Sequence, residues 1–179
     1  MRLLSVLLLA LAPLAADVTQ CVCDPAKPET MQARECSLCR EAEKQPNGTK
    51  VFFLKDINPR KPNRWLALPR RHLPAQHSLA ALTPAERTGL WRAAIDRARE
   101  QWGDRWALAI NGDRVRTQCH THLHIGRLIE GVETPNFVDV DGPEHIPVPE
   151  DGTGLWVYPV GGRLRVHLGE QLTETVLLR

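Results

Sequence analysis

Three histidines at alternate positions, in the run Cys119-His120-Thr121-His122-Leu123-His124, constrain the fold more than any other feature of the sequence. Side chains of a β-strand alternate between its two faces, so this pattern predicts a strand with all three imidazoles on one face, each roughly 6.6 Å from the next at about 3.3 Å per residue. The residues between them are predicted to face the core. Three imidazoles on one face beside an apolar opposite face indicate a functional site.

The segments before this run predict an antiparallel sheet covered by one long helix. Val51–Leu54 and Arg64–Leu68 are short apolar runs separated by Asn and Pro residues, a pattern typical of two paired strands. Thr83-Pro84-Ala85-Glu86 has the residues of a capping box, and apolar residues then recur at helical spacing until Gly103. Trp106–Ile110 predicts a further strand.

Beyond Glu130 the signals predict more β-structure. Leu155–Val160 and Leu164–Leu168 flank Gly161-Gly162, which favours a hairpin, and Thr173–Leu178 predicts a last strand. The predicted fold class is therefore α+β: an antiparallel sheet, one long α-helix and a C-terminal β extension over residues 131–179.

The charge balance bears on the partners that the chain can bind. The sequence has 23 basic and 21 acidic side chains, a formal charge of +2, and its 42% apolar composition is that of one globular domain. This charge leaves no electrostatic footprint for nucleic acid, so we expect no nucleic-acid partner. Any recognition of phosphate has to be local.

The N-terminus predicts export. Arg2 precedes an apolar run that ends in small residues before Asp17, so residues 1–16 are typical of a secretory signal peptide, and the protein is expected to be periplasmic or extracellular. A membrane contact would then arise only from an uncleaved signal or a lipid substrate. Residues 17–48, with several prolines and little periodicity, predict an irregular arm.

The five cysteines leave two interpretations open. An exported chain favours disulfides, but an odd number leaves at least one thiol unpaired. Cys36 and Cys39 have the C-x-x-C spacing of zinc ligands, and a disulfide between them is the alternative. Cys21 and Cys23 have no determined role, and Cys119 is expected to be a buried small hydrophobic residue.

Imidazole chemistry at phosphorus is the first function that the run suggests. A neutral imidazole can attack phosphorus to give a labile phosphoramidate that water resolves, and a neighbouring histidine can protonate or hold an oxygen. Asn111, Thr117 and Gln118 lie upstream with amide and hydroxyl groups that can neutralise developing charge. The alternative use of the run is metal ligation, in which His72 and one of the three histidines would join the cysteine pair.

Five motifs, in this order, resemble the histidine triad (HIT-like) superfamily of nucleotide hydrolases and transferases, over about residues 36 to 128. They are the cysteine pair, Lys55-Asp56-Ile57-Asn58-Pro59, Leu68-Pro69-Arg70-Arg71-His72, the capped helix, and His120-Thr121-His122-Leu123-His124-Ile125. The resemblance implies a HIT-like core over residues 49–130 and a homodimer.

The resemblance also implies residue roles. His122 would be the nucleophile and His124 would contact the phosphate or leaving group. Asp56, Asn111 and Thr117 would bind the nucleotide. A structural zinc would be held by Cys36, Cys39, His72 and His120.

Alternatives remain within and beyond this interpretation. Ala109-Ile110-Asn111 followed by Arg116-Thr117-Gln118 also resembles the bacterial CDP-diacylglycerol pyrophosphatases, which would imply a lipid-linked nucleotide as substrate. A protein that binds nucleotides without turnover is a further possibility. A third is a catalytic zinc with an open position, completed by one of the three histidines.

Overall fold

The computed structural model describes residues 18, 21–72, 74, 77–149 and 151–179, and these form an α+β fold with one antiparallel sheet and two α-helices. The predicted signal peptide, residues 1–16, lies outside the described residues. Within them, no helix has both the length and the apolar character that crossing a bilayer requires.

The sheet has seven strands in the order β1-β2-β4-β3-β6-β7-β5. Their bounds are β1 Val51–Lys55, β2 Trp65–Pro69, β3 Trp106–Ile110, β4 Leu123–Arg127, β5 Phe137–Val140, β6 Gly154–Val160 and β7 Arg163–Glu170. The predicted pairing of the first two strands is confirmed, with Phe53 opposite Ala67. The C-terminal extension continues the same sheet, because β6 pairs with β3.

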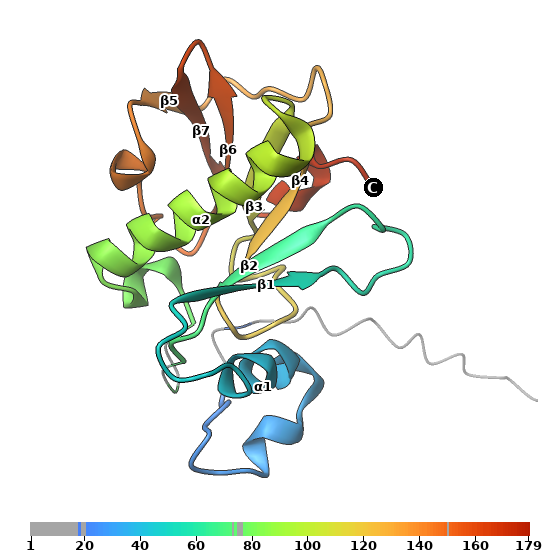
Figure 1. The fold of residues 1–179 in the computed structure, drawn as a ribbon, viewed down its shortest axis with the longest axis vertical. Coiled ribbons are helices and arrows are strands. Elements are labelled where there is room, and N and C mark those ends of the chain that lie inside the picture. The colour runs from blue at the N-terminus through green and yellow to red at the C-terminus, as the bar shows by residue number, and fades with distance from the viewer. Residues whose placement is uncertain (1–17, 19–20, 73, 75–76, 150) are drawn as a thin grey trace, which may run out of the picture.

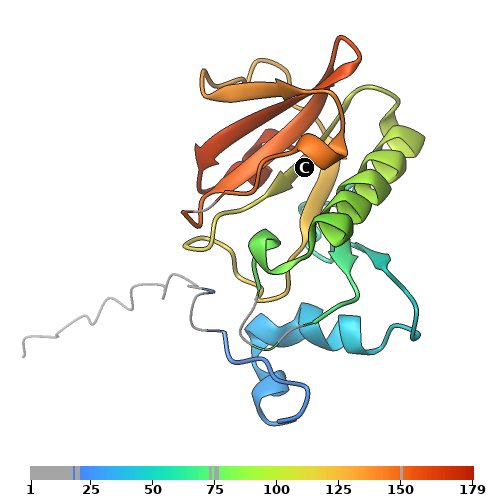
Figure 2. The same cartoon turned by 90° about the vertical axis from the view of Figure 1, so that its left-hand side faces the viewer.

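Helix α2, Pro84–Trp102, covers one face of this sheet (Figure 2). The predicted capping box is confirmed: the amide of Glu86 donates to the Thr83 hydroxyl, and the Glu86 carboxylate accepts from the Thr83 amide. Its apolar side, including Leu90 and Trp91, packs on buried residues of the central strands. The helix therefore leaves the other face of the sheet available for a site.

The face opposite α2 is covered by two separate segments. Near β1 and β2 this cover is α1, Ser37–Glu43, which lies on the other side of these strands from α2 (Figure 1). Leu38 and Ala42 of α1 pack against Phe52 and Leu68, whose neighbours in the strands pack with α2 instead. Over the central strands, the 3-10 turn η6 (Thr173–Val176) buries Val176. The histidine run lies between these two covers.

Outside the histidine run, two predictions about secondary structure were wrong. The arm over residues 17–48 is not wholly irregular, because Leu38, Cys39 and Ala42 form the buried side of α1. Thr173–Leu178 forms η6 and a single bridge from Leu177 to Leu128 rather than a strand, since the side-chain oxygen of Asn111 accepts bonds from the amides of Thr173 and Glu174 and bends the chain.

Candidate functional site

The histidine run is only partly a strand, which corrects the prediction that its imidazoles share one face. β4 begins at Leu123, so His120 and His122 lie in the connection that precedes it. The amide of Cys119 donates to the carbonyl of Glu35 (2.8 Å), and a disulfide joins Cys119 to Cys21. These bonds hold the connection against the N-terminal segment, and His120 therefore lies apart from His122 and His124, whose rings are neighbours.

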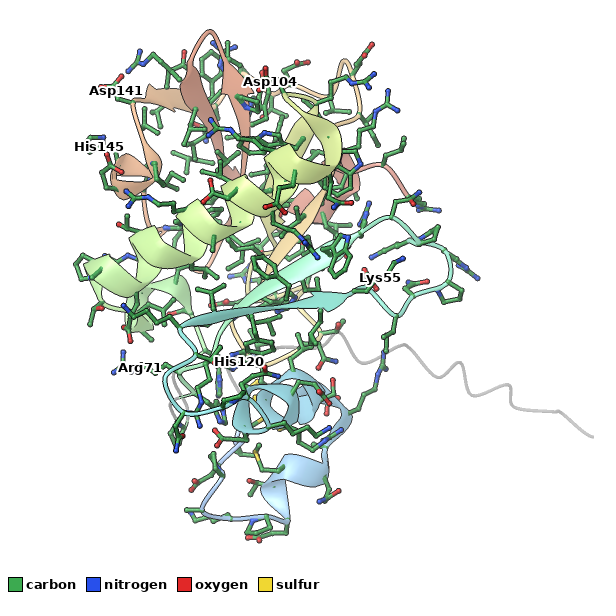
Figure 3. All side chains as sticks on the ribbon, in the orientation of Figure 1. Lys55, Arg71, Asp104, His120, Asp141 and His145 are labelled. Atoms are coloured by element: carbon green, nitrogen blue, oxygen red, sulfur yellow. A yellow bond between two sulfur atoms is a disulfide. The ribbon has the colours of Figure 1, made fainter. Side chains whose placement is uncertain are left out.

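His120 lies beside α1, near the end of β2 (Figure 3). Its Nε2 lies 2.7 Å from the carbonyl oxygen of Pro69. Because a carbonyl oxygen only accepts, this nitrogen donates, and the lone pair of the neutral ring is on Nδ1. The ring of His72 stands edge-on to that of His120, with 5.5 Å between centroids. His120 is thus prepared to ligate a cation through one nitrogen.

Cys39, His72 and His120 form a group that could hold a metal. One donor atom from each lies within 4.8 Å of the others. Cys39 belongs to α1, His72 follows β2, and His120 precedes β4, so the group joins three segments that are distant in the sequence. A sulfur and two imidazole nitrogens are donors typical of zinc sites.

The polar atoms around this group support metal binding. The His72 side chain is 1% exposed, and neither of its ring nitrogens has a hydrogen-bond partner among the described residues. Its Nδ1 lies 3.4 Å from a carboxylate oxygen of Glu43, the kind of second partner that orients a ligating histidine. His77 is also buried with both nitrogens unpaired within the described part of the chain, and its ring centroid is 5.8 Å from that of His72.

Burial sets the protonation of this group. It lowers the pKa values of His77 and His120 to about 4, so both imidazoles are neutral at pH 7, the form that ligates metals. Burial raises the pKa of the Cys39 thiol to about 12. A metal that bound there would have to displace a proton from sulfur, because the thiolate is the ligand.

Cys36, predicted to be a zinc ligand, is instead bonded to Cys23. Cys36 occupies the position just before α1, whereas Cys39 lies inside the helix, and the two sulfurs of the C-x-x-C have different partners. Cys119, expected to be a buried hydrophobic residue, is buried but disulfide-bonded to Cys21. Four cysteines are thus paired, and Cys39 is the free thiol of the described residues.

His122 turns to the other side of the connection. Its Nδ1 lies 2.7 Å from the carbonyl oxygen of His120, so this nitrogen donates and leaves the lone pair on Nε2. The side chain is almost fully buried, and burial, reinforced by the charges of His124 and Arg116, lowers its pKa well below the ordinary value. His122 is therefore a neutral imidazole whose Nε2 is its potential nucleophile.

His124 lies beside His122 and against a carboxylate. The two rings are edge-on with 4.9 Å between centroids, and Nδ1 of His124 is 3.7 Å from an oxygen of Glu174. Burial lowers the pKa of His124 to about 4, while Glu174 acts in the opposite direction. The ring is neutral without a ligand, and the carboxylate favours its protonation when an anion arrives.

Glu174, in η6, is held in place by cations from the turn between β1 and β2. Its carboxylate accepts a bond from Arg64 (2.8 Å) and one from Lys61. Arg64 is itself buried and donates to the carbonyls of Leu177 and Leu178. Burial would raise the pKa of Glu174, but neighbouring positive charge outweighs it and lowers the pKa. The charge comes from His124 in its protonated form, and then from Lys61 and Arg64.

His122, His124 and Glu174 line one cavity of about 590 Å³. It opens between α1 and the turn after β1, on the face opposite α2. Its walls combine cations, amides and hydroxyls with apolar side chains, namely Leu38, Leu54, Ile57, Leu66 and Val115. The volume is in the range of small-molecule sites.

All four residues predicted to bind nucleotide line this cavity: Asp56, Asn111, Thr117 and Gln118. Three of them already use their side chains within the protein, and for Asp56 the bond is one that its carboxylate accepts from the amide of Asn58. The Asn111 oxygen accepts bonds from Thr173 and Glu174, and the Gln118 oxygen accepts one from Ser37. The structure thus brings these residues together with His122, and it places the predicted metal ligand His120 in the neighbouring group.

Two charged residues of the cavity had not been assigned a role from the sequence. Glu174 is 50 residues from His124, in a tail without a recognisable pattern, and no sequence signal marks it. Arg116 adjoins the predicted Thr117, but an arginine in a polar loop resembles a solvated one. Its burial, 2% exposed, is visible only in the structure.

A comparison with protein-family models finds no match for this chain, and a comparison with curated proteins finds none either. Arguments about its function therefore rest on the geometry of the site.

Proposed function

We propose that the protein is a hydrolase or nucleotidyl transferase that acts on a nucleotide phosphoester, phosphoanhydride or phosphoramidate. The observation that supports this most is the bond from Nδ1 of His122 to the His120 carbonyl, which leaves Nε2 as the nucleophile beside the cavity. We include in the proposal the HIT-like fold, since four of the five motifs meet at this cavity and the adjoining group.

The reaction has two displacements at phosphorus. Nε2 of His122 attacks the α-phosphorus, and the bond from phosphorus to the leaving atom breaks. That atom, an oxygen in an ester or anhydride and a nitrogen in a phosphoramidate, departs with the electron pair. His124, beside Glu174, holds or protonates the departing atom. Water then attacks phosphorus, the phosphorus–nitrogen bond breaks, and the nucleotide leaves with His122 restored.

A structural zinc forms part of the proposal. Cys39, His72 and His120 would supply three ligands, and His77 replaces Cys36 as the fourth, because its nitrogens are buried without partners inside the described ranges. Four protein ligands leave no open position, so the metal would tie α1 to the connection that bears His122.

Export of the protein is part of the same proposal. The disulfides Cys21–Cys119 and Cys23–Cys36 are typical of oxidising compartments outside the cytoplasm. They agree with the leader-like residues 1–16 of the sequence.

A lipid-linked nucleotide is the second candidate substrate. Ile57 is 98% exposed at the mouth of the cavity, and Leu38, Leu54 and Leu66 continue an apolar wall from it. A large side chain so exposed next to apolar lining suits an acyl chain better than water. A CDP-diacylglycerol-like molecule would place its diphosphate at His122 and its lipid along this wall.

A turnover assay tests the proposal. The full chain is incubated with dinucleoside polyphosphates, nucleoside phosphoramidates and CDP-diacylglycerol in detergent, and release of nucleoside monophosphate is measured. We expect turnover of at least one class and none by His122→Ala. Absence of turnover across the panel, or equal turnover by the variant, would contradict the proposal.

A matched substitution separates the two substrate classes. Ile57→Ser removes the exposed apolar side chain without touching the histidines. If the substrate is lipid-linked, KM for CDP-diacylglycerol rises while kcat for soluble nucleotides is unchanged. If Ile57→Ser and the unsubstituted protein have the same KM for CDP-diacylglycerol, Ile57 gives no support for a lipid-linked substrate.

A further inference from the structure

Arg116 is a buried cation whose hydrogen-bonding capacity is not met by the protein. Its side chain is 2% exposed, and Nη2 donates to Oδ1 of Asp113 at 2.9 Å. Nε and Nη1 are buried with no hydrogen-bond partner among the residues that the structure describes. Leaving charged donors buried and unpaired costs more free energy than most proteins tolerate without a functional reason.

The backbone around Arg116 fixes the guanidinium in this position. The amides of Val115 and Arg116 both donate to the carbonyl of Gly112, which closes a tight turn after β3. Asp113 is held in turn, since its amide donates to the carbonyl of Gly152. The arginine is therefore held from two sides, its charge only partly neutralised by a carboxylate that is itself 27% exposed.

The side chain that carries these unpaired donors adjoins the candidate reaction centre. Arg116 lines the same cavity as His122, Thr117 and Gln118. Its positive charge also acts on His122, and it contributes to lowering the pKa of that imidazole after burial and His124. A cation this close to the nucleophile discourages protonation of the imidazole and attracts anions.

We infer that Arg116 forms an oxyanion subsite that binds the non-bridging oxygens of the phosphate group attacked by His122. The inference rests on the proposed function, which says that the bound phosphate is the one attacked by His122. It adds the residue that neutralises the negative charge of that phosphate. Attack on phosphorus places additional negative charge on these oxygens, and a fixed buried guanidinium stabilises that charge without reorganisation. Arginine suits this task because its N–H groups are spread in a plane and remain charged.

The chemistry of the subsite applies to a phosphate of any source. A nucleotide α-phosphate, the diphosphate of a lipid-linked nucleotide and free pyrophosphate present the same oxygens. The site is expected to favour phosphates over monovalent anions such as chloride, because charge-assisted hydrogen bonds from a guanidinium to phosphate oxygens are strong.

Calorimetric titration with pyrophosphate, CMP and CDP-diacylglycerol micelles tests the inference in a His122→Asn background, which prevents turnover. Adding Arg116→Met is expected to weaken binding of pyrophosphate and CMP by about tenfold or more. Arg114→Met is the matched control, since Arg114 is exposed in the same loop, and its affinity should stay within about twofold. Equal affinities of the Arg116→Met and Arg114→Met proteins would overturn the inference.

Arg116→Lys covers the case in which the methionine variant does not fold. It keeps a charge near Asp113 but loses the planar donors, so we expect folded protein with weaker pyrophosphate binding. In addition, pyrophosphate should raise the melting temperature of the unsubstituted protein more than sodium chloride at equal ionic strength. Absence of that rise would overturn the inference by itself.

These results distinguish failure of the inference from failure of the proposed function. Binding of pyrophosphate that depends on Arg116, in a protein that turns over no nucleotide, supports the subsite and refutes the enzyme. Turnover that depends on His122 but is unchanged by Arg116→Met supports the enzyme and refutes the subsite.

Discussion

His120 and His122 are two residues apart, yet their rings use opposite nitrogens. His120 donates through Nε2 to Pro69 and keeps its lone pair on Nδ1, whereas His122 donates through Nδ1 to His120 and keeps it on Nε2. The first lone pair is available to a metal shared with Cys39 and His72, and the second to a ligand in the cavity of about 590 Å³. The backbone carbonyl that each ring meets therefore decides which chemistry the imidazole can perform.

The surroundings of the two centres differ in the same way. The Cys39 group consists of buried donors that are neutral at pH 7, and the carboxylate of Glu43 lies against His72. The cavity is lined by charges, with Glu174 against His124, and with Arg116, two of whose side-chain nitrogens have no partner within the described residues. An enclosed set of neutral donors suits a cation that stays, while a charged open cavity suits an anion that comes and goes.

Replacing each of the two histidines with alanine is the strongest test of this difference. His122→Ala is expected to lower kcat/KM by at least about 10³-fold, as removal of a nucleophile does in other covalent enzymes, while metal content is unchanged. His120→Ala is expected to lower metal content while the cavity still binds nucleotide. Loss of metal from His122→Ala, measured by elemental analysis, would contradict the division.

Removal of the metal tests the enclosed centre alone. Protein prepared with zinc should contain about one zinc per chain, and a chelator should lower its melting temperature, because the metal joins three segments. Cys39→Ser should likewise lose zinc and melt at a lower temperature. Cobalt(II) in place of zinc should give a thiolate charge-transfer band in the unsubstituted protein that this variant lacks. Full metal binding by Cys39→Ser would show that the sulfur is not a ligand.

The two disulfides close loops of different length, and we therefore expect them to contribute different amounts to the stability of the region around the enclosed centre. Cys21–Cys119 spans 98 residues and Cys23–Cys36 spans 13. Chain-entropy estimates give about 4.7 kcal/mol for the longer loop and about 2.9 kcal/mol for the shorter one. Urea unfolding of the two double-alanine variants should show the larger loss for Cys21 and Cys119. Equal losses would show that loop length does not govern their contribution.

Much of the framework was predictable from the sequence because its signals are local. The capping box at Thr83 and Glu86, the strand pair of β1 and β2, and the C-terminal hairpin depend on residues close together in the chain. The alternation in the histidine run was equally local but misleading. The disulfide at Cys119 and the bond to Glu35 are long-range, and they override the strand pattern before Leu123.

Which residues become partners within the site depends still more on contacts between distant parts of the sequence. A C-x-x-C gives no indication that Cys23 takes Cys36 and leaves Cys39 for His72. Likewise, nothing in the tail distinguishes Glu174 from other exposed acids until η6 is placed against His124. Spacing predicts which residues can meet, whereas three-dimensional packing decides which of them do.

Glu174→Gln gives the smallest expected effect and tests the charged side of the comparison. We expect a fall in kcat of about tenfold, because His124 loses the carboxylate that favours its protonated form. The pKa of Glu174 is lower in the folded protein than its ordinary value of 4.5, so its contribution to stability is complete above that pH and declines as the pH falls through the folded value.

The stability difference between Glu174→Gln and the unsubstituted protein should consequently be largest near pH 7 and shrink below pH 4.5, measured by thermal unfolding across this range. Glu170→Gln is a control on β7, outside the cavity, and should leave kcat unchanged. A stability difference that grows on acidification would contradict the ion-pair network of Glu174.

The central claim, that His122 and not its neighbours attacks phosphorus, is tested most directly by trapping the intermediate. A substrate labelled on its α-phosphate is mixed with the enzyme, quenched in alkali during the first turnover, and the label is located by peptide mass spectrometry. The account predicts an acid-labile nucleotidyl group on His122. Label on His120 or His124, or product formation without any labelled histidine during the first turnover, would contradict it.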